Sequence, residues 1–259
     1  MDVVRRALST ETSAPHGTTN AYVVGRDPAL LVDPAARTDQ LDELVRARGV
    51  EHILVTHTHP DHVGAVAAYR DELDATCWAL RSHTDRFEAA TGFEPDDAFG
   101  DGDRLELGTG RVRILALPGH APDHLGVDVG GGPVCCGDCA VREGSVVVGG
   151  PNADMRAYLN ALRRLRSLDP PTLLPGHGPP IERPAAVLDR LIEHRERRER
   201  RVYEAVASGA RAPDEIVDRA YEKDLSGVED LARATVIAHL RKLAADDRIE
   251  WDGERARPR

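Results

Sequence analysis

One ten-residue stretch constrains the fold of this chain more than any other feature: residues 55–64 read VTHTHPDHVG. The stretch directly follows the apolar run Ile53-Leu54-Val55, which predicts a short buried strand. Its potential metal ligands are His57, His59, Asp61 and His62. A lone histidine is usually a surface residue or a hydrogen-bonded core residue. A cluster of this kind needs partners, so we expect the fold to bring distant segments to the end of this strand.

Three further segments share one local form: a short apolar strand, a tight turn with glycine, and a side chain able to bind a metal. These segments are Leu117-Pro118-Gly119-His120, Cys136-Gly137-Asp138 and Leu174-Pro175-Gly176-His177. Glycine lets the backbone turn sharply at the end of a rigid strand, so such side chains can converge at one edge of a sheet. The candidate ligands are then His57, His59, Asp61, His62, His120, Asp138 and His177.

The types of ligand indicate the metal and the class of site. Imidazole and carboxylate groups without thiolates suit Zn²⁺, with Fe or Mn as alternatives. Seven side chains are too many for one tetrahedral ion and match two ions. We therefore expect two metals per chain, at a three-histidine site and an Asp/His/His site that share Asp138. Open positions would hold a water or hydroxide between metals ~3.5–4 Å apart, which favours hydrolysis over a structural role.

The remaining pattern predicts two domains. Up to about residue 184, strand-like and helix-like segments alternate, with helices expected at 38–48, 64–73 and 155–168. Residues 81–103 form a long polar insertion that could border the site. Beyond this region a long charged helix, two shorter helices and a short strand follow, which is a winged-helix pattern. We expect a catalytic domain over 1–184 and a winged-helix-like C-terminal domain over 185–259.

Composition excludes some classes of function. The formal net charge of −10 opposes non-specific binding of nucleic acid. No apolar stretch approaches the ~20 residues of a membrane span. The first residues contain no hydrophobic segment typical of a secretory signal, so we expect a cytoplasmic protein. Cys136-x-x-Cys139 could be a redox or zinc pair, but we expect reduced, structural cysteines because no second pair exists.

The motifs resemble those of the metallo-β-lactamase superfamily. They are H-T-H-P-D-H at 57–62, P-G-H at 118–120, G-D at 137–138 and P-G-H-G at 175–178, in the order of that family. The resemblance implies an α/β fold, a four-layer αββα sandwich. It also implies a first metal at His57, His59 and His120, a second at Asp61, His62 and His177, and Asp138 as the bridge. Asp33 resembles a family position that supports the site.

Two residues are candidates for catalysis. Asp61 is placed to orient the nucleophile or carry a proton. His124 lies four residues after His120, and the related proteins keep a histidine there. It could orient a ligand, stabilise an oxyanion or hydrogen-bond a backbone carbonyl.

Longer segments narrow the resemblance to the β-lactamase-like protein 2 group, which has a winged-helix-like extension. They include PGHAPDHLGV at 118–127 and GDCAVREGSVVV at 137–148. We expect a hydrolase of a small ester or thioester, as in glyoxalase II-like relatives. A metal-dependent single-strand endoribonuclease, with RNA as partner, is one alternative, and a mononuclear-iron persulfide dioxygenase is another. The sequence is also compatible with a homo-oligomer.

Overall fold

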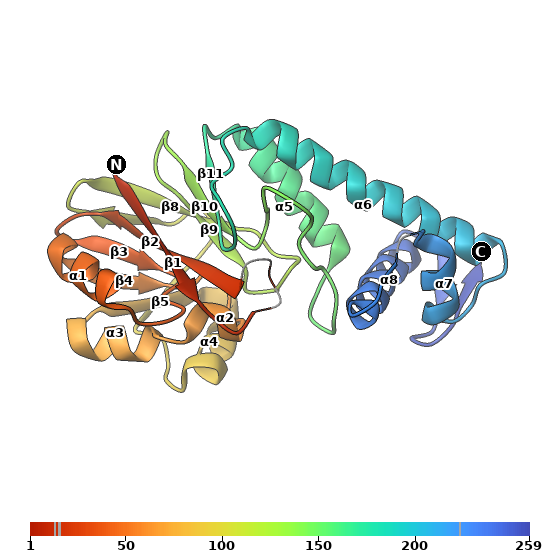
Figure 1. The fold of residues 1–259 in the computed structure, drawn as a ribbon, viewed down its shortest axis with the longest axis horizontal. Coiled ribbons are helices and arrows are strands. Elements are labelled where there is room, and N and C mark those ends of the chain that lie inside the picture. Colours follow the sequence, from red (N-terminus) through yellow and green to blue (C-terminus); the bar gives the residue numbers. More distant parts are fainter. Residues whose placement is uncertain (13, 15–16, 223) are drawn as a thin grey trace.

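Two mixed sheets packed face to face form the centre of the protein (Figure 1). The computed structural model describes residues 1–12, 14, 17–222 and 224–259. The first sheet runs β1 (Val3–Ser9), β2 (Thr18–Gly25), β3 (Ala29–Val32), β4 (Val50–Leu54), β5 (Thr76–Leu80) and β6 (Asp97–Phe99), in that spatial order. The second runs β11 (Leu173–Pro175), β10 (Val134–Gly137), β9 (Leu125–Asp128), β8 (Gly110–Ala116) and β7 (Arg104–Leu107).

Helices cover the outer face of each sheet. The first sheet packs against α1 (Asp39–Arg48), α3 (Val66–Leu73) and α4 (Thr84–Thr91), and the second against α5 (Met155–Leu168) and the start of α6 (Pro184–Ala207). Strand β2 shows the alternation that this layering requires. Ala21 and Val23 face the helices, whereas Tyr22 and Val24 face the second sheet. The expected αββα sandwich of helix, sheet, sheet and helix is confirmed.

Parallel pairing places several strand ends at one edge. Strands β3, β4 and β5 are parallel neighbours in the first sheet, and β10 and β11 are parallel in the second. Their carboxyl ends therefore point in a common direction within each sheet. The segments after β4, β10 and β11 carry most of the candidate ligands.

Local signals set most element bounds. Helix α1 begins after Thr38, whose hydroxyl accepts a hydrogen bond from Leu41 N, and it ends at Gly49 in the left-handed region with φ 60°. Helix α5 has the predicted bounds of 155–168. The polar insertion at 81–103 contains α4 and β6, and the N-terminal segment contains β1, none of which the pattern predicted.

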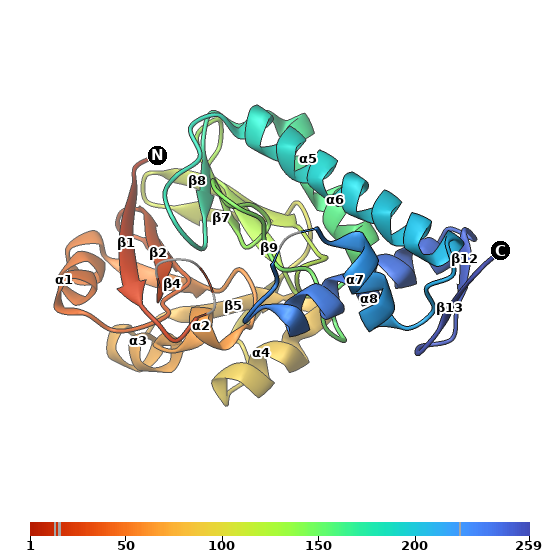
Figure 2. The same ribbon diagram turned by 45° about the vertical axis from the view of Figure 1, so that its right-hand side comes forward.

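Helix α6 continues past the sandwich and joins it to the last elements (Figure 2). These are α7 (Pro213–Ala220), α8 (Glu229–Ala245) and the antiparallel pair β12 (Ile249–Trp251) and β13 (Ala256–Pro258). Leu188 and Leu191 of α6 belong to the core under the second sheet, whereas Val202 and Val206 belong to the C-terminal core. None of the helices in the described ranges is long and apolar enough to cross a membrane.

Candidate metal centre

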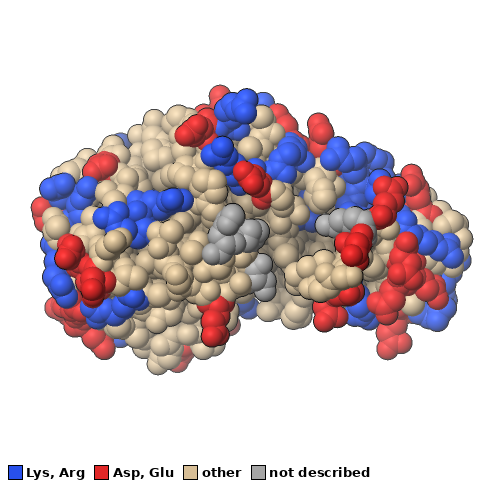
Figure 3. Space-filling model, in the orientation of Figure 1, with Lys and Arg blue, Asp and Glu red and all other residues tan. Residues whose placement is uncertain are grey.

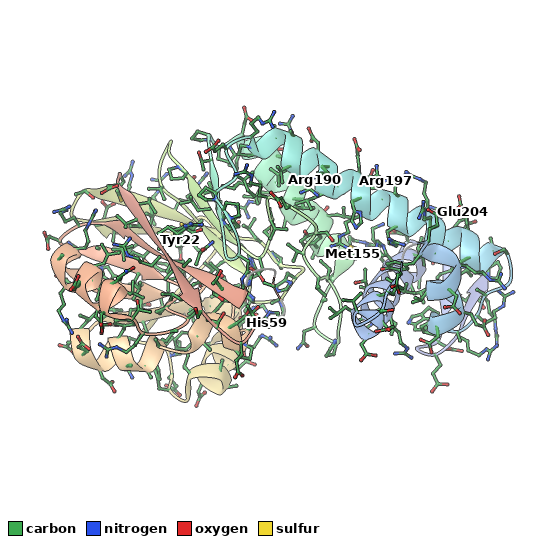
Figure 4. The ribbon with its side chains drawn as sticks, in the orientation of Figure 1. Tyr22, His59, Met155, Arg190, Arg197 and Glu204 are labelled. Atoms are coloured by element: carbon green, nitrogen blue, oxygen red, sulfur yellow. The ribbon has the colours of Figure 1, made fainter. Side chains whose placement is uncertain are left out.

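The seven candidate ligands meet at one edge of the sandwich. His57 follows β4, His59 precedes the short helix α2 (Pro60–Val63), and Asp61 and His62 lie within that helix. His120, Asp138 and His177 follow β8, β10 and β11. Figure 4 shows His59 on the side of the sandwich that faces the C-terminal helices. Ligand atoms within 4.8 Å of one another form three groups: His57 with His59 and His120, His57 with His62 and Asp138, and Asp61 with His62 and His177.

Asp138 lies between the groups. Its Oδ2 is 3.6 Å from His120 Nε2 and 3.4 Å from His177 Nε2, and its Oδ1 is 3.7 Å from His62 Nε2. On one side, Nε2 of His57 and of His120 each lie 2.9 Å from His59 Nδ1. On the other side, His177 Nε2 lies 3.5 Å from Asp61 Oδ2. This is the arrangement expected of a carboxylate shared by two metals.

Two observations show that the cluster fits metal ions. His62 Nε2 and Asp138 Oδ1 are buried and have no hydrogen-bond partner in the described part of the chain, a costly state that bound cations would relieve. Four of the histidines also bond an outer acceptor through Nδ1, as metal-binding histidines do. These bonds join His57 to Thr56 Oγ1 (3.1 Å), His62 to Asp33 Oδ2 (3.0 Å), His120 to Val147 O (2.8 Å) and His177 to Thr18 O (2.8 Å).

Glycine makes room for the cluster at Gly176. A Cβ atom there would lie 2.5 Å from Asp138 Oδ1 and 2.8 Å from His62 Cε1. Any side chain at this position would therefore displace two candidate ligands. The P-G-H-G turn needs glycine for this close approach.

Burial and charge set the protonation of these groups. Burial lowers the pKa of His59 to about 4 and holds the pKa of His57 well below its usual value, which favours the neutral imidazole that binds metals. For His62, burial opposes protonation, but the nearby carboxylates, chiefly Asp33, raise its pKa to about 9. Burial also opposes ionisation of Asp138, yet the surrounding histidines hold its pKa well below the usual value, so it is ionised at neutral pH.

Asp33 supports both halves of the centre. Its carboxylate accepts hydrogen bonds from Thr56 N (2.6 Å), from Thr56 Oγ1 (2.8 Å) and from His62 Nδ1 (3.0 Å). Because Thr56 Oγ1 donates to Asp33, it accepts from Nδ1 of His57. Asp33 therefore orients His62 directly and His57 through one hydroxyl, the supporting place predicted from the resemblance.

His124 lies beside the cluster and is fully buried. Its Nε2 accepts a hydrogen bond of 3.0 Å from Asp138 N, and burial lowers its pKa to about 3. The ring therefore holds the backbone of the shared carboxylate as a neutral imidazole. Of the three roles considered for His124, this contact corresponds to orienting a ligand, and its backbone partner is an amide rather than a carbonyl. Direct participation in catalysis stays a prediction.

Sequence reasoning missed Asp123. Its Oδ2 accepts from Thr58 N (2.9 Å) and Thr58 Oγ1 (2.7 Å), and its Oδ1 accepts from Arg86 Nε (3.0 Å). Thr58 stands between two candidate ligands, so Asp123 fixes the H-T-H segment, and Arg86 brings the 81–103 insertion to the site. The signal was its place beside His124 in the 118–127 motif.

Comparison with known proteins agrees with the fold. Residues 14–177 match the model of the metallo-beta-lactamase superfamily, and the chain belongs to this superfamily. Membership of this superfamily, together with a relative named as a thioesterase, indicates a metal-dependent hydrolase. The expectation of a superfamily hydrolase related to the β-lactamase-like protein 2 group is thereby confirmed.

Two curated relatives and one solved structure illustrate the likeness. A beta-lactamase-like protein 2 homolog of Caenorhabditis elegans is 28% identical, over 78% of this chain and 67% of that protein. An atrochrysone carboxyl ACP thioesterase of Aspergillus fumigatus is 26% identical, over 89% of this chain and 77% of its own. A metallo-beta-lactamase family protein from Thermus thermophilus has the same fold, with a TM-score of 0.76, 23% identity and 98% of both chains covered.

Proposed function

We propose that the chain is a dinuclear zinc hydrolase that cleaves a small-molecule thioester or ester. The single observation that carries this proposal is the place of Asp138 between two sets of candidate ligands. His57, His59 and His120 would hold one ion, and Asp61, His62 and His177 the other. Iron or manganese would suit the same oxygen and nitrogen ligands.

The exposure of the ligands indicates where a substrate would enter. His57 and His62 are at most 1% exposed, whereas His59, Asp61 and His120 are partly exposed. Bound metals would supply a water of lowered pKa and a positive charge for the developing oxyanion. On this open side the Asp61 carboxylate can orient the attacking water or accept its proton. Asp33 and His124 would keep the ligands in place while this happens.

Two features favour a thioester or ester as substrate, and the net charge is compatible with it. A relative over most of the chain is named as an acyl-carrier thioesterase. The net charge of −10 does not oppose a small acyl substrate. Val147, whose carbonyl holds His120, leaves its apolar side chain 39% exposed beside the cluster, where an acyl group could pack.

The alternatives have less support. An endoribonuclease would need a basic path for the phosphate backbone. On the face in Figure 3, Lys and Arg are interspersed with Asp and Glu. Along α6, Arg197 pairs with Glu193 and Arg201 with Glu222. A persulfide dioxygenase would hold a single iron, whereas the candidate ligands here are enough for two ions.

We also propose that residues 185–259 form a winged-helix-like domain beside the catalytic domain of 1–184. The last part of α6, α7, α8 and the β12–β13 pair have the order of elements that such a domain needs, and they share a core that includes Val202, Ile216 and Ile249.

Assays of one metal-loaded sample against two substrates test this function. Purified protein, with its metals counted by mass spectrometry, is assayed on S-lactoylglutathione and on a labelled single-stranded RNA. Asp61→Ala is the test variant, and Asp71→Ala, at an exposed position of α3, is the matched control. We expect thioester turnover that Asp61→Ala abolishes and Asp71→Ala preserves. RNA cleavage with the same dependence on Asp61 would replace the proposal with the endoribonuclease, and one iron per chain with neither activity would refute both.

A further inference from the structure

Helix α6 buries a charged side chain next to the sandwich. Arg195 is 3% exposed, and its Nη2 donates a hydrogen bond to Val146 O. Its guanidinium carbon lies 5.6 Å from the centroid of the Tyr158 ring. Arg195 takes part in none of the ion pairs between described residues, and its Nε has no hydrogen-bond partner there. A buried cation without a carboxylate is costly, so its contacts call for an explanation beyond stability.

One of these contacts leads to His120. Val146 O accepts from Arg195, and the next carbonyl, Val147 O, accepts from His120 Nδ1 at 2.8 Å. The loop that contains them lies outside regular secondary structure. Packing of the Val146 and Val148 side chains in the core holds this loop in place, but hydrogen bonds set the rotation of its peptide planes. Arg195 therefore fixes the peptide whose neighbour orients a candidate ligand.

The second contact leads to Asp138. The hydroxyl of Tyr158 donates a hydrogen bond of 3.0 Å to Cys139 O, directly after Asp138. The backbone of Tyr158 also lies against Gly119, where a Cβ atom would be 2.2 Å from Tyr158 N. The aromatic ring beneath Arg195 thus belongs to a residue that contacts the chain neighbours of both Asp138 and His120.

We infer that Arg195 is a positioning residue that sets the orientation of His120 and Asp138 from helix α6. Because α6 also carries the C-terminal core, this residue links the accessory part of the chain to the metal centre. The inference rests on the proposed metal centre and is independent of the substrate. A stabilising role alone would leave the affinity for metals unchanged once the protein is folded.

The test compares two arginines of the same helix. Arg190 is also on α6 (Figure 4) and also donates to carbonyls of the same loop, including Gly144 O at 2.6 Å and Arg142 O at 3.1 Å. Within the described part of the chain, neither Gly144 nor Arg142 hydrogen-bonds a candidate ligand. Arg195→Met and Arg190→Met are titrated with Zn²⁺ against a chromophoric chelator, and their Co²⁺ forms are compared by visible absorption. Urea unfolding of the metal-free proteins measures the loss of stability separately.

We expect Arg195→Met to bind Zn²⁺ about 10- to 100-fold more weakly, with an altered Co²⁺ spectrum, and Arg190→Met to match the unchanged protein. Tyr158→Phe, which keeps the ring and loses the bond to Cys139, should alter the spectrum as well, and it decides the question if Arg195→Met does not fold. Unchanged Zn²⁺ affinity and Co²⁺ spectra in Arg195→Met would overturn the inference. If Arg195→Met does not fold, unchanged affinity and spectra in Tyr158→Phe would overturn it instead. An equal loss of Zn²⁺ affinity in Arg190→Met would also overturn it. If the unchanged protein bound no Zn²⁺, the proposed centre itself would fall, and this inference with it.

Discussion

Replacing Asp33 by Asn tests the support of the metal centre with a minimal change of shape. Asp33 is 1% exposed and has a φ of 52°, in the left-handed region that Asn also tolerates. The Asn oxygen can still accept from Thr56 N, and its amide can donate to Thr56 Oγ1. The amide cannot accept from His62 Nδ1, so one charge-assisted hydrogen bond of 3.0 Å is lost.

The size of the effect follows from that one bond. A hydrogen bond to a charged group contributes about 1.5–3 kcal/mol, which corresponds to about 10- to 150-fold in affinity. We expect Asp33→Asn to bind Zn²⁺ more weakly by this factor, measured by chelator competition at about pH 9, where the proton that Asp33 helps to hold on His62 competes less than at pH 7. Asp96→Asn is the matched control, because Asp96 also accepts from a backbone amide, Cys77 N at 2.9 Å, but contacts no candidate ligand. Unchanged Zn²⁺ affinity in Asp33→Asn would refute the assigned role.

Three further predictions follow from the pKa values and the packing. Burial disfavours protonation of His62, but nearby carboxylates raise its pKa to about 9. Zn²⁺ must therefore displace a proton from His62 at neutral pH. The affinity of the protein for Zn²⁺ should rise between pH 7 and about 9, measured by titrations across this range. Gly119→Ala places a Cβ 2.2 Å from Tyr158 N at a φ of 133° and should destabilise the fold by more than about 2 kcal/mol in urea unfolding. Gly131→Ala, which has a positive φ of 73° but a Cβ that meets nothing within 4 Å, should destabilise it less. Burial and neighbouring arginines lower the pKa of His194 from 6.5 to about 4. The unfolded chain therefore binds a proton that the folded chain does not, and the free energy of unfolding falls as the pH decreases from 6.5 to about 4. His194→Gln should lose less stability over this pH range in urea unfolding.

Local patterns in the sequence predicted much of the site. Each candidate ligand lies in a short motif after an apolar strand, so the ligands could be expected at sheet edges. His57 and His177 follow strands of different sheets, and their meeting also depends on how the two sheets pack. The helix expected at 155–168 has strong periodicity, and its bounds agree with those of the observed helix. Asp33 was predicted through a resemblance.

The remaining features depend on contacts between distant segments. Strand β1 (VVRRALS) has no strict alternation of apolar and polar residues, and it forms by pairing with β2, from Val3 opposite Val24 to Ser9 opposite Thr18. Helix α4 and β6 lie in a polar insertion without clear periodicity. The role of Arg195 depends on its contact with Val146 O, whereas the surrounding sequence HRERRERR has the alternating charges typical of a solvated helix face.

The central claim is that seven side chains hold two metals with Asp138 shared between them. Native mass spectrometry of the zinc-loaded protein, beside His177→Ala, tests it most directly. We expect two zinc ions per chain in the unchanged protein and one in His177→Ala, which keeps the group of His57, His59 and His120 intact. A single ion in the unchanged protein, or two ions retained in His177→Ala, would contradict the account.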